Sequence, residues 1–195
     1  MILVVFVLMT GSIATAQRQT RPQIPETGPF WVGGSFANSL RFGGGTFGFG
    51  LTPMAGYVFA PNFSVGPFVR LDYYYERFLI GPGRYARFSS FNTGPGIFAR
   101  ADIARMFFAQ IEYEHAFLQR AEQDAFGNIF IDNNGKVVKE SLQQDFVYIG
   151  AGYSSGGYVQ VGISIHYNIL DDALSERFPW DYRFSVRVPI NSTKK

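Results

Sequence analysis

The sequence predicts an all-β protein, namely an eight-stranded antiparallel up-and-down transmembrane β-barrel preceded by an N-terminal signal peptide. Three observations lead to this prediction. Eight segments alternate apolar and polar residues, aromatic residues gather at both ends of the apolar faces, and short connections alternate with long ones. The composition agrees, because 195 residues with 17% aromatic content and no cysteine match neither a disordered chain nor a disulfide scaffold.

The N-terminus has the pattern of an export signal. Ile2 to Met9 is an apolar run too short to span a bilayer as a helix, and Ala14-Thr15-Ala16 has the small-x-small form that signal peptidase recognises. The alternative for this run is a buried N-terminal strand. We expect a signal peptide, a flexible periplasmic segment, an outer-membrane β-barrel and a C-terminal tail at residues 1–16, 17–29, 30–190 and 191–195.

The first four predicted strands lie between residues 30 and 103. Phe30–Phe42 alternates weakly, because Asn38 interrupts its apolar face, whereas Phe47–Phe59 sets aromatic and aliphatic residues against glycines. Phe63–Phe78 opposes an apolar face to a face with three charges. Phe88–Ile103 places small and charged residues on its polar face, so all four segments fit strands with two unlike faces.

The last four predicted strands lie between residues 106 and 190. Met106–Arg120 has glutamates on its polar face, and Gln143–Tyr153 is the second weak case. Tyr158–Ile169 is the clearest, with one purely apolar face, and Trp180–Ile190 carries three charges on its polar face. Each segment supplies at least the nine or so residues that a tilted strand needs to cross a bilayer.

The charges on the polar faces decide which face lies inside. A water-soluble barrel would place the apolar face inside, but these polar faces are rich in glycine and arginine and poor in lysine. Arginine suits a packed network of ion pairs, so we expect the polar faces to fill the barrel and the apolar faces to meet lipid. The expected structural network inside the barrel is Arg41, Arg70, Asp72, Glu76, Arg100, Asp102, Glu112, Glu114, Asp181, Arg183 and Arg187.

Aromatic residues are expected to form two girdles around an aliphatic belt. A bilayer selects this distribution, because aromatic rings with a polar tip settle at the level of the headgroups. At one end of the strands the girdle residues are Tyr57, Phe59, Phe63, Phe107 and Tyr153. At the other end they are Tyr73, Tyr75, Phe117, Tyr167, Trp180 and Tyr182.

The connections alternate in length, as in an up-and-down barrel whose long loops face outside the cell. The connections at residues 60–62, 104–105 and 154–157 are tight, and those at 79–87, 121–142 and 170–179 are long and polar. Only residues 43–46 are short on the side of the long loops.

The strand Leu51-Thr52-Pro53-Met54-Ala55-Gly56-Tyr57, the turn Pro61-Asn62-Phe63-Ser64-Val65-Gly66 and the aromatic-alternating segment Trp180–Ile190 carry a family resemblance. The chain resembles the small outer-membrane β-barrel proteins of Gram-negative bacteria, namely the OmpA-like membrane domains and porin-family barrel domains. The resemblance covers roughly residues 30–190 and implies a location in the cell outer membrane. It departs at the end, where such barrels tend to finish on an aromatic residue and this chain continues past Ile190.

A non-enzymatic structural or protein-interaction role, as a subunit of a larger outer-membrane assembly, is the leading hypothesis for function. An eight-stranded barrel is just wide enough for side chains to fill, so a small porin-like channel is the alternative. A lipid-modifying enzyme is the third, because Glu112 with Glu114 and His166 with Ser164 share inner faces, and His115 lies on the apolar face near the outer end. No catalytic motif, cofactor site or metal site is expected.

The expected partners are outer-membrane lipids and lipopolysaccharide. Other outer-membrane or surface proteins are expected to dock on the 121–142 connection, whose Asn134-Gly135 predicts a hairpin that extends its flanking strands as a β-ribbon. Nucleic acid is not an expected partner, because the net charge is only +2 and no basic cluster precedes Lys194.

Overall fold

The computed structural model describes residues 28–81, 83–103, 106–124, 128–132, 136–170 and 177–190. These residues form β1 (Phe30–Gly43), β2 (Thr46–Ala60), β3 (Phe63–Gly81), β4 (Arg84–Ile103), β5 (Phe107–Ala121), β6 (Lys139–Ser154), β7 (Gln160–Asn168) and β8 (Trp180–Ile190). The predicted signal peptide (1–16), most of the 17–29 segment and the 191–195 tail lie outside the described residues.

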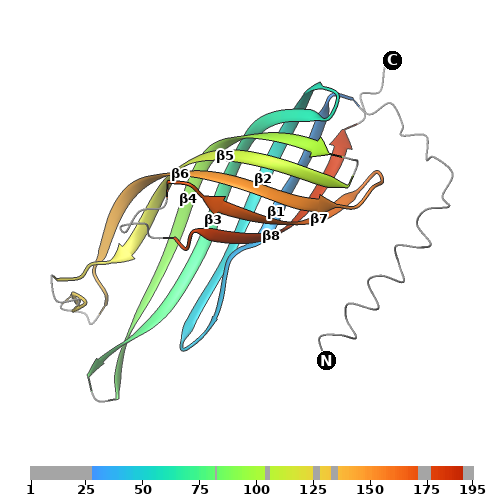
Figure 1. Cartoon of the computed structure of the whole chain (residues 1–195). Helices are drawn as coiled ribbons and strands as arrows, with labels where there is room; N and C mark the ends of the chain where they lie inside the picture. The colour runs from blue at the N-terminus through green and yellow to red at the C-terminus, as the bar shows by residue number, and fades with distance from the viewer. Residues whose placement is uncertain are drawn as a thin grey trace, which may run out of the picture.

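The strands form one antiparallel sheet that closes on itself. Each strand pairs with the next along the chain, and β8 pairs with β1 from Phe30↔Ile190 to Phe36↔Phe184, so the order is up-and-down around a closed barrel (Figure 1). The predicted all-β class and antiparallel up-and-down order are confirmed. Within the described residues, no helix combines the length and hydropathy of a membrane span.

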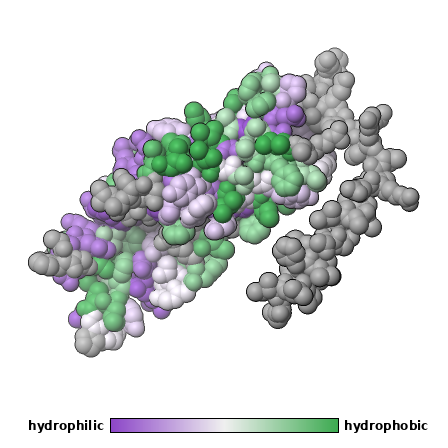
Figure 2. All heavy atoms as spheres, viewed as in Figure 1, coloured by the Kyte–Doolittle hydropathy of each residue, from purple (hydrophilic) through white to green (hydrophobic). Residues whose placement is uncertain are grey.

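Burial along the strands alternates as the sequence does, but with polar residues inside. On β5, Glu112 and Glu114 are at most 1% exposed, whereas the neighbouring Ile111 and Tyr113 are 47% and 43% exposed. Figure 2 shows many apolar side chains on the visible outer wall of the barrel. The apolar face is therefore the outer face, the reverse of a barrel that is stable in water.

The weak alternation predicted for the first strand coincides with an irregular ladder. The register between β1 and β2 shifts between Phe36 and Asn38 and again between Asn38 and Arg41. Each shift places consecutive side chains out of step with the partner strand. The side chains of Asn38 and Arg41 lie outside the described residues, and Arg41 is the one predicted network residue for which this is so.

The prediction of a loop at residues 79–87 was wrong, because most of this segment belongs to the β3–β4 ladder. The ladder extends to the pair Gly81↔Arg84. Leu79 pairs with Tyr85 and Arg77 with Arg87, so β3 and β4 run beyond the barrel as a long ribbon (Figure 1). Arg77 and Arg87 interrupt the apolar face of this ribbon, and beyond them Leu79 and Ile80 are both exposed, so the two-residue alternation ends before the turn. We call residues 75–89, on both sides of the turn, the β3–β4 ribbon.

The long connection between β5 and β6 folds against that ribbon. It forms two small antiparallel bridges, Gln123↔Ile129 and Ile131↔Val137, in place of a single extended ribbon. Ile129 and Val137 pack against a cluster that includes Ala86 and Phe88 of β4, and Val137 is 6% exposed. The apolar residues of the predicted docking edge are thus partly covered, although Phe130 stays 46% exposed. The connection is also shorter than predicted, since β6 begins at Lys139.

Candidate functional site

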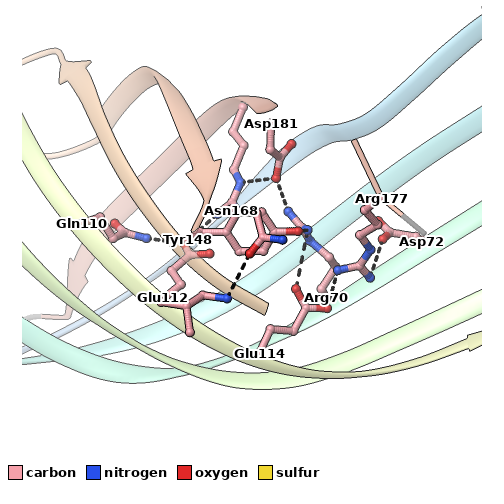
Figure 3. Close-up of polar contacts among 11 residues, drawn as sticks. Arg70, Asp72, Gln110, Glu112, Glu114, Tyr148, Asn168, Arg177 and Asp181 are labelled. Carbon is pink, nitrogen blue, oxygen red and sulfur yellow. Dashed lines mark hydrogen bonds and ion pairs between the residues drawn. The ribbon is translucent and has the colours of Figure 1, made fainter. Parts of the chain in front are cut away.

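A cluster of charged side chains crosses the middle of the barrel interior. The cluster, called the central plug, draws on three strands and on the β7–β8 connection, and its side chains are at most 10% exposed (Figure 3). Its residues are Arg70, Asp72, Glu112, Glu114, Arg177, Asp181 and Arg183. Burying so many ions is tolerable only if each one is paired, because an unpaired buried charge costs several kcal/mol.

One half of the central plug is a chain of alternating charges that ends on β8. The Arg183 guanidinium donates to Glu112 Oε1 at 2.6 Å and to Asp181 Oδ2 at 2.8 Å. Arg70 donates to the same Asp181 oxygen from the other side and lies 3.5 Å from Glu114 Oε2. The carboxylate of Asp181 thus bridges two arginines, one from β3 and one from β8.

The other half depends on Arg177, which reaches into the barrel from the β7–β8 connection. Its two terminal nitrogens contact Glu114 Oε1 at 2.7 Å and Asp72 Oδ2 at 3.1 Å. Burial alone would lower the pKa of Arg177, but the carboxylates of Glu114 and Asp72 hold it above its ordinary value, so the guanidinium stays charged. The sequence prediction missed Arg177 because it lies in a loop, where no periodicity indicates which way a side chain points.

Aromatic rings complete the central plug. The guanidinium carbons of Arg70 and Arg183 lie 5.2 and 5.5 Å from the ring centre of Tyr148, and that of Arg177 lies 4.7 Å from Phe146. Cation–π contacts of this length add to the ion pairs in a buried site. The two rings fill the space between the charges, so the middle of the barrel is packed.

A second buried layer lies nearer the end at which β1 begins and β8 ends. We call it the aromatic layer, and it contains Trp31, Phe68, Phe98 and Phe108, all at most 4% exposed. Arg100 stacks 3.5 Å from the ring centre of Phe108. Asp102 accepts from Arg100 Nε at 2.9 Å and from Arg187 Nη1 at 2.8 Å, so two arginines share one carboxylate.

The structure brings nine of the eleven predicted network residues into these two layers. Glu76 lies nearer the outer end, where its carboxylate accepts from the Tyr74 hydroxyl at 2.6 Å, and the Arg41 side chain is not described. Sequence reasoning missed the aromatic layer, since large rings on a face otherwise rich in glycine and serine carried no recognisable signal.

A cavity of about 590 Å³ lies beside the central plug, toward the end of the barrel from which the β3–β4 ribbon projects. Its lining includes Tyr74, Phe88 and Ser90, together with Asp72 and Arg177 of the central plug. The ion pair between Asp72 and Arg177 therefore borders this cavity, which we call the outer cup.

The side-chain pairs that suggested catalysis are engaged in other ways. Glu112 and Glu114 each contact a different arginine, and nothing holds them as a pair that shares a proton. His166 Nε2 lies 3.0 Å from Ser164 Oγ, with no carboxylate bonded to its other nitrogen. Over the described residues, no group of three or more metal-ligating side chains is present.

His115 faces outward, as its place on the apolar face indicated. Its Nδ1 lies 2.7 Å from Asp145 Oδ1, and the hydroxyl of Tyr113 donates to the same oxygen at 3.0 Å. The three side chains form a polar cluster on the outer wall, and among the described residues no serine or threonine is bonded to it.

The predicted girdle residues lie on the outer face at both ends of the strands. All are exposed except Tyr75, which is partly buried. At one end Phe59 contacts Phe63 and Phe107 contacts Tyr153, with ring centres 6.2 and 5.8 Å apart. At the other end Tyr167 contacts Trp180 at 4.7 Å.

No protein-family model, no curated protein and no solved structure matches this chain.

Proposed function

We propose that this chain is an integral outer-membrane β-barrel protein with a structural or protein-interaction role. The observation that carries the proposal is the inverted surface of the closed sheet. Ile97, Ile163 and Ile111 are 63%, 54% and 47% exposed, while Arg70 and Glu114 are at most 1% exposed. A continuous apolar wall of this kind is unstable in water and stable in hydrocarbon.

Two further features support a membrane location. The apolar wall is bounded at both ends by exposed aromatic rings, as interfacial anchoring requires. Every strand of the ring has a hydrogen-bonded partner on both sides, so no unpaired edge would meet lipid. The outer membrane is the compartment that fits a β-barrel whose sequence begins with the pattern of an export signal.

The packed interior favours an anchoring or docking role over transport. The central plug joins side chains from β3, β5 and β8 across the barrel, and its residues Asp72 and Arg177 border the outer cup. A solute would have to break several buried ion pairs to pass. A small channel is therefore the alternative, and a lipid-modifying enzyme the third candidate.

Replacing Ile163 by Arg tests the proposal. If this residue faces mid-bilayer lipid, the substitution lowers the free energy of unfolding by about 2 to 4 kcal/mol. The matched control is Val159→Arg, because Val159 is similarly exposed but lies in the β6–β7 connection. Its cost is expected to be below about 1 kcal/mol. Urea unfolding from lipid vesicles measures both, and equal small effects would contradict membrane insertion.

Three simple measurements separate the candidates. An inserted barrel migrates differently in detergent gels before and after boiling, whereas a water-soluble one does not. Single-channel conductance in planar bilayers would favour the channel, and a change in the mass of lipid A on expression would favour the enzyme. We expect heat-modifiable migration, no stable conductance and unchanged lipid A.

A further inference from the structure

The β3–β4 ribbon carries a basic pair that no carboxylate neutralises. Arg77 and Arg87 are directly opposed across the ladder, and both are exposed. Like charges at directly opposed positions destabilise a sheet unless an anion lies between them. Among the described carboxylates, none lies within ion-pair distance of either side chain, and the adjacent Glu76 faces the interior, where it bonds to Tyr74.

This arrangement distinguishes the ribbon from the rest of the molecule. Arg84, at the tip of the ribbon, also forms no ion pair with a described carboxylate. Every other arginine whose side chain is described pairs with an aspartate or glutamate. They are Arg70, Arg100, Arg120, Arg177, Arg183 and Arg187. The arginines with described side chains that form no ion pair with a described carboxylate therefore all lie on this ribbon.

Arg77 is held in a fixed orientation. Its Nε donates to the hydroxyl of Tyr75 at 3.0 Å, and its aliphatic stem lies beside Gly45 in the β1–β2 turn, where an added Cβ would come within 3.4 Å of it. Both terminal nitrogens are left for an external acceptor. A guanidinium fixed in this way presents two parallel donors, which is the geometry that binds a phosphate group.

The height of the pair indicates where that phosphate would come from. Arg77 lies four residues beyond Tyr73 of the outer girdle, or about 13 Å along the strand. With the tilt of such strands this is about 10 Å above the girdle. The headgroup layer extends roughly 5 to 7 Å beyond the hydrocarbon. Because Arg77 Nε bonds to the hydroxyl of Tyr75, two residues nearer the girdle, its guanidinium is directed back toward the outer surface of that layer.

We propose that Arg77 and Arg87 bind the phosphate group of a phosphorylated lipid in the outer leaflet, with Arg77 as the pre-oriented donor. The inference rests on the proposed membrane insertion and adds a specific lipid contact to it. The lipid phosphate supplies the missing counter-charge of the ribbon and fixes the height of the barrel relative to the headgroups.

The test compares the full-length protein with the double variant Arg77→Gln/Arg87→Gln. Binding of fluorescent bisphosphorylated lipid A is measured in detergent micelles and in phosphatidylethanolamine vesicles. We expect the double variant to bind about five- to tenfold more weakly. We expect wild-type binding to weaken as salt rises. Arg120→Gln is the matched control, since it removes an equally exposed arginine that already pairs with Glu140, and it should leave binding within about twofold of wild type.

Three results would overturn the inference. They are unchanged binding by the double variant, equal wild-type binding of dephosphorylated lipid A, and full competition by millimolar inorganic phosphate, which would indicate a general anion site. An acidic peptide that competes better than lipid A would reassign the surface to a protein partner. Heat-modifiable migration and vesicle insertion are scored separately. If the protein shows no heat-modifiable migration and does not insert into vesicles, the proposed function is contradicted. Binding in detergent micelles still tests the phosphate contact in that case.

Discussion

The central plug and the aromatic layer bury arginines in two different ways. In the central plug, Arg70 and Arg183 share the carboxylate of Asp181, and every charged side chain is at most 10% exposed. In the aromatic layer, Arg100 lies on the face of Phe108, and its partner Asp102 is 26% exposed. The first layer is stabilised by mutual neutralisation, and the second by ring faces together with partial hydration. Removing one charge should therefore have very different consequences in the two layers.

The largest effect is expected for Glu114→Ala in the central plug. Glu114 is fully buried and contacts both Arg70 and Arg177, so its loss leaves two buried guanidinium groups short of a partner. We expect the free energy of unfolding to fall by about 3 to 5 kcal/mol, as measured by chemical unfolding from vesicles. The control is Glu140→Ala, which removes an exposed pair and should cost less than about 1 kcal/mol. A similar loss in both variants would show that the plug is not tightly coupled.

A medium effect is expected for Gly56→Ala in the aromatic layer. A Cβ at this position would overlap the indole ring of Trp31, which is 4% exposed and in tilted contact with the ring of Phe98. A rigid ring has little room to move, so we expect a cost of about 1 to 3 kcal/mol and a shift in the fluorescence of Trp31. The measurement uses a Trp180→Phe background, since these are the two tryptophans of the chain. An unshifted spectrum would mean that the layer is loosely packed.

The smallest effect is expected for Arg100→Met. The substitution removes a cation–π contact and one ion pair, but Asp102 keeps its bond to Arg187 and the methionine fills the space of the stem. We expect a cost of about 1 kcal/mol in the same unfolding assay. A cost equal to that of Glu114→Ala would show that the aromatic layer behaves as a second plug.

Much of the fold could be predicted because alternation is a direct consequence of strand geometry. Successive side chains of a strand point to opposite faces of the sheet. A strand with one apolar and one polar face therefore shows a two-residue alternation whichever solvent meets its outer face. The outer part of the β3–β4 ribbon was missed because its alternation breaks down. Arg77 and Arg87 interrupt the apolar face, and beyond them the consecutive residues Leu79 and Ile80 are both exposed. The ladder continues there although the residue pattern no longer shows it, because pairing depends on the backbone and the pattern depends on the surroundings of each face.

The candidate site was predictable only in part. The inward position of a charge follows from its place on a strand, and for that reason Arg70 and Glu114 could be assigned to one interior. The pairing of the inward charges depends on the register around the closed sheet and on the conformation of the loops. Arg177 shows this most clearly, because it contacts Glu114, 63 positions earlier in the sequence. A two-residue alternation specifies neither the register between strands nor the direction in which the side chain of a loop residue points.

The position of Asp181 and Arg183 on the last strand has a consequence for assembly. Arg70 and Glu112 emerge earlier in the chain, yet their nearest ionic partners, Asp181 and Arg183, arrive only with β8, 111 and 71 positions later. Until β8 docks on β1 and β7, the nascent interior holds charges without counter-charges, and a partly assembled sheet is disfavoured in lipid. Closing the seam and neutralising the interior are then one event, so the barrel is expected to assemble in an all-or-none step that waits for its C-terminal strand.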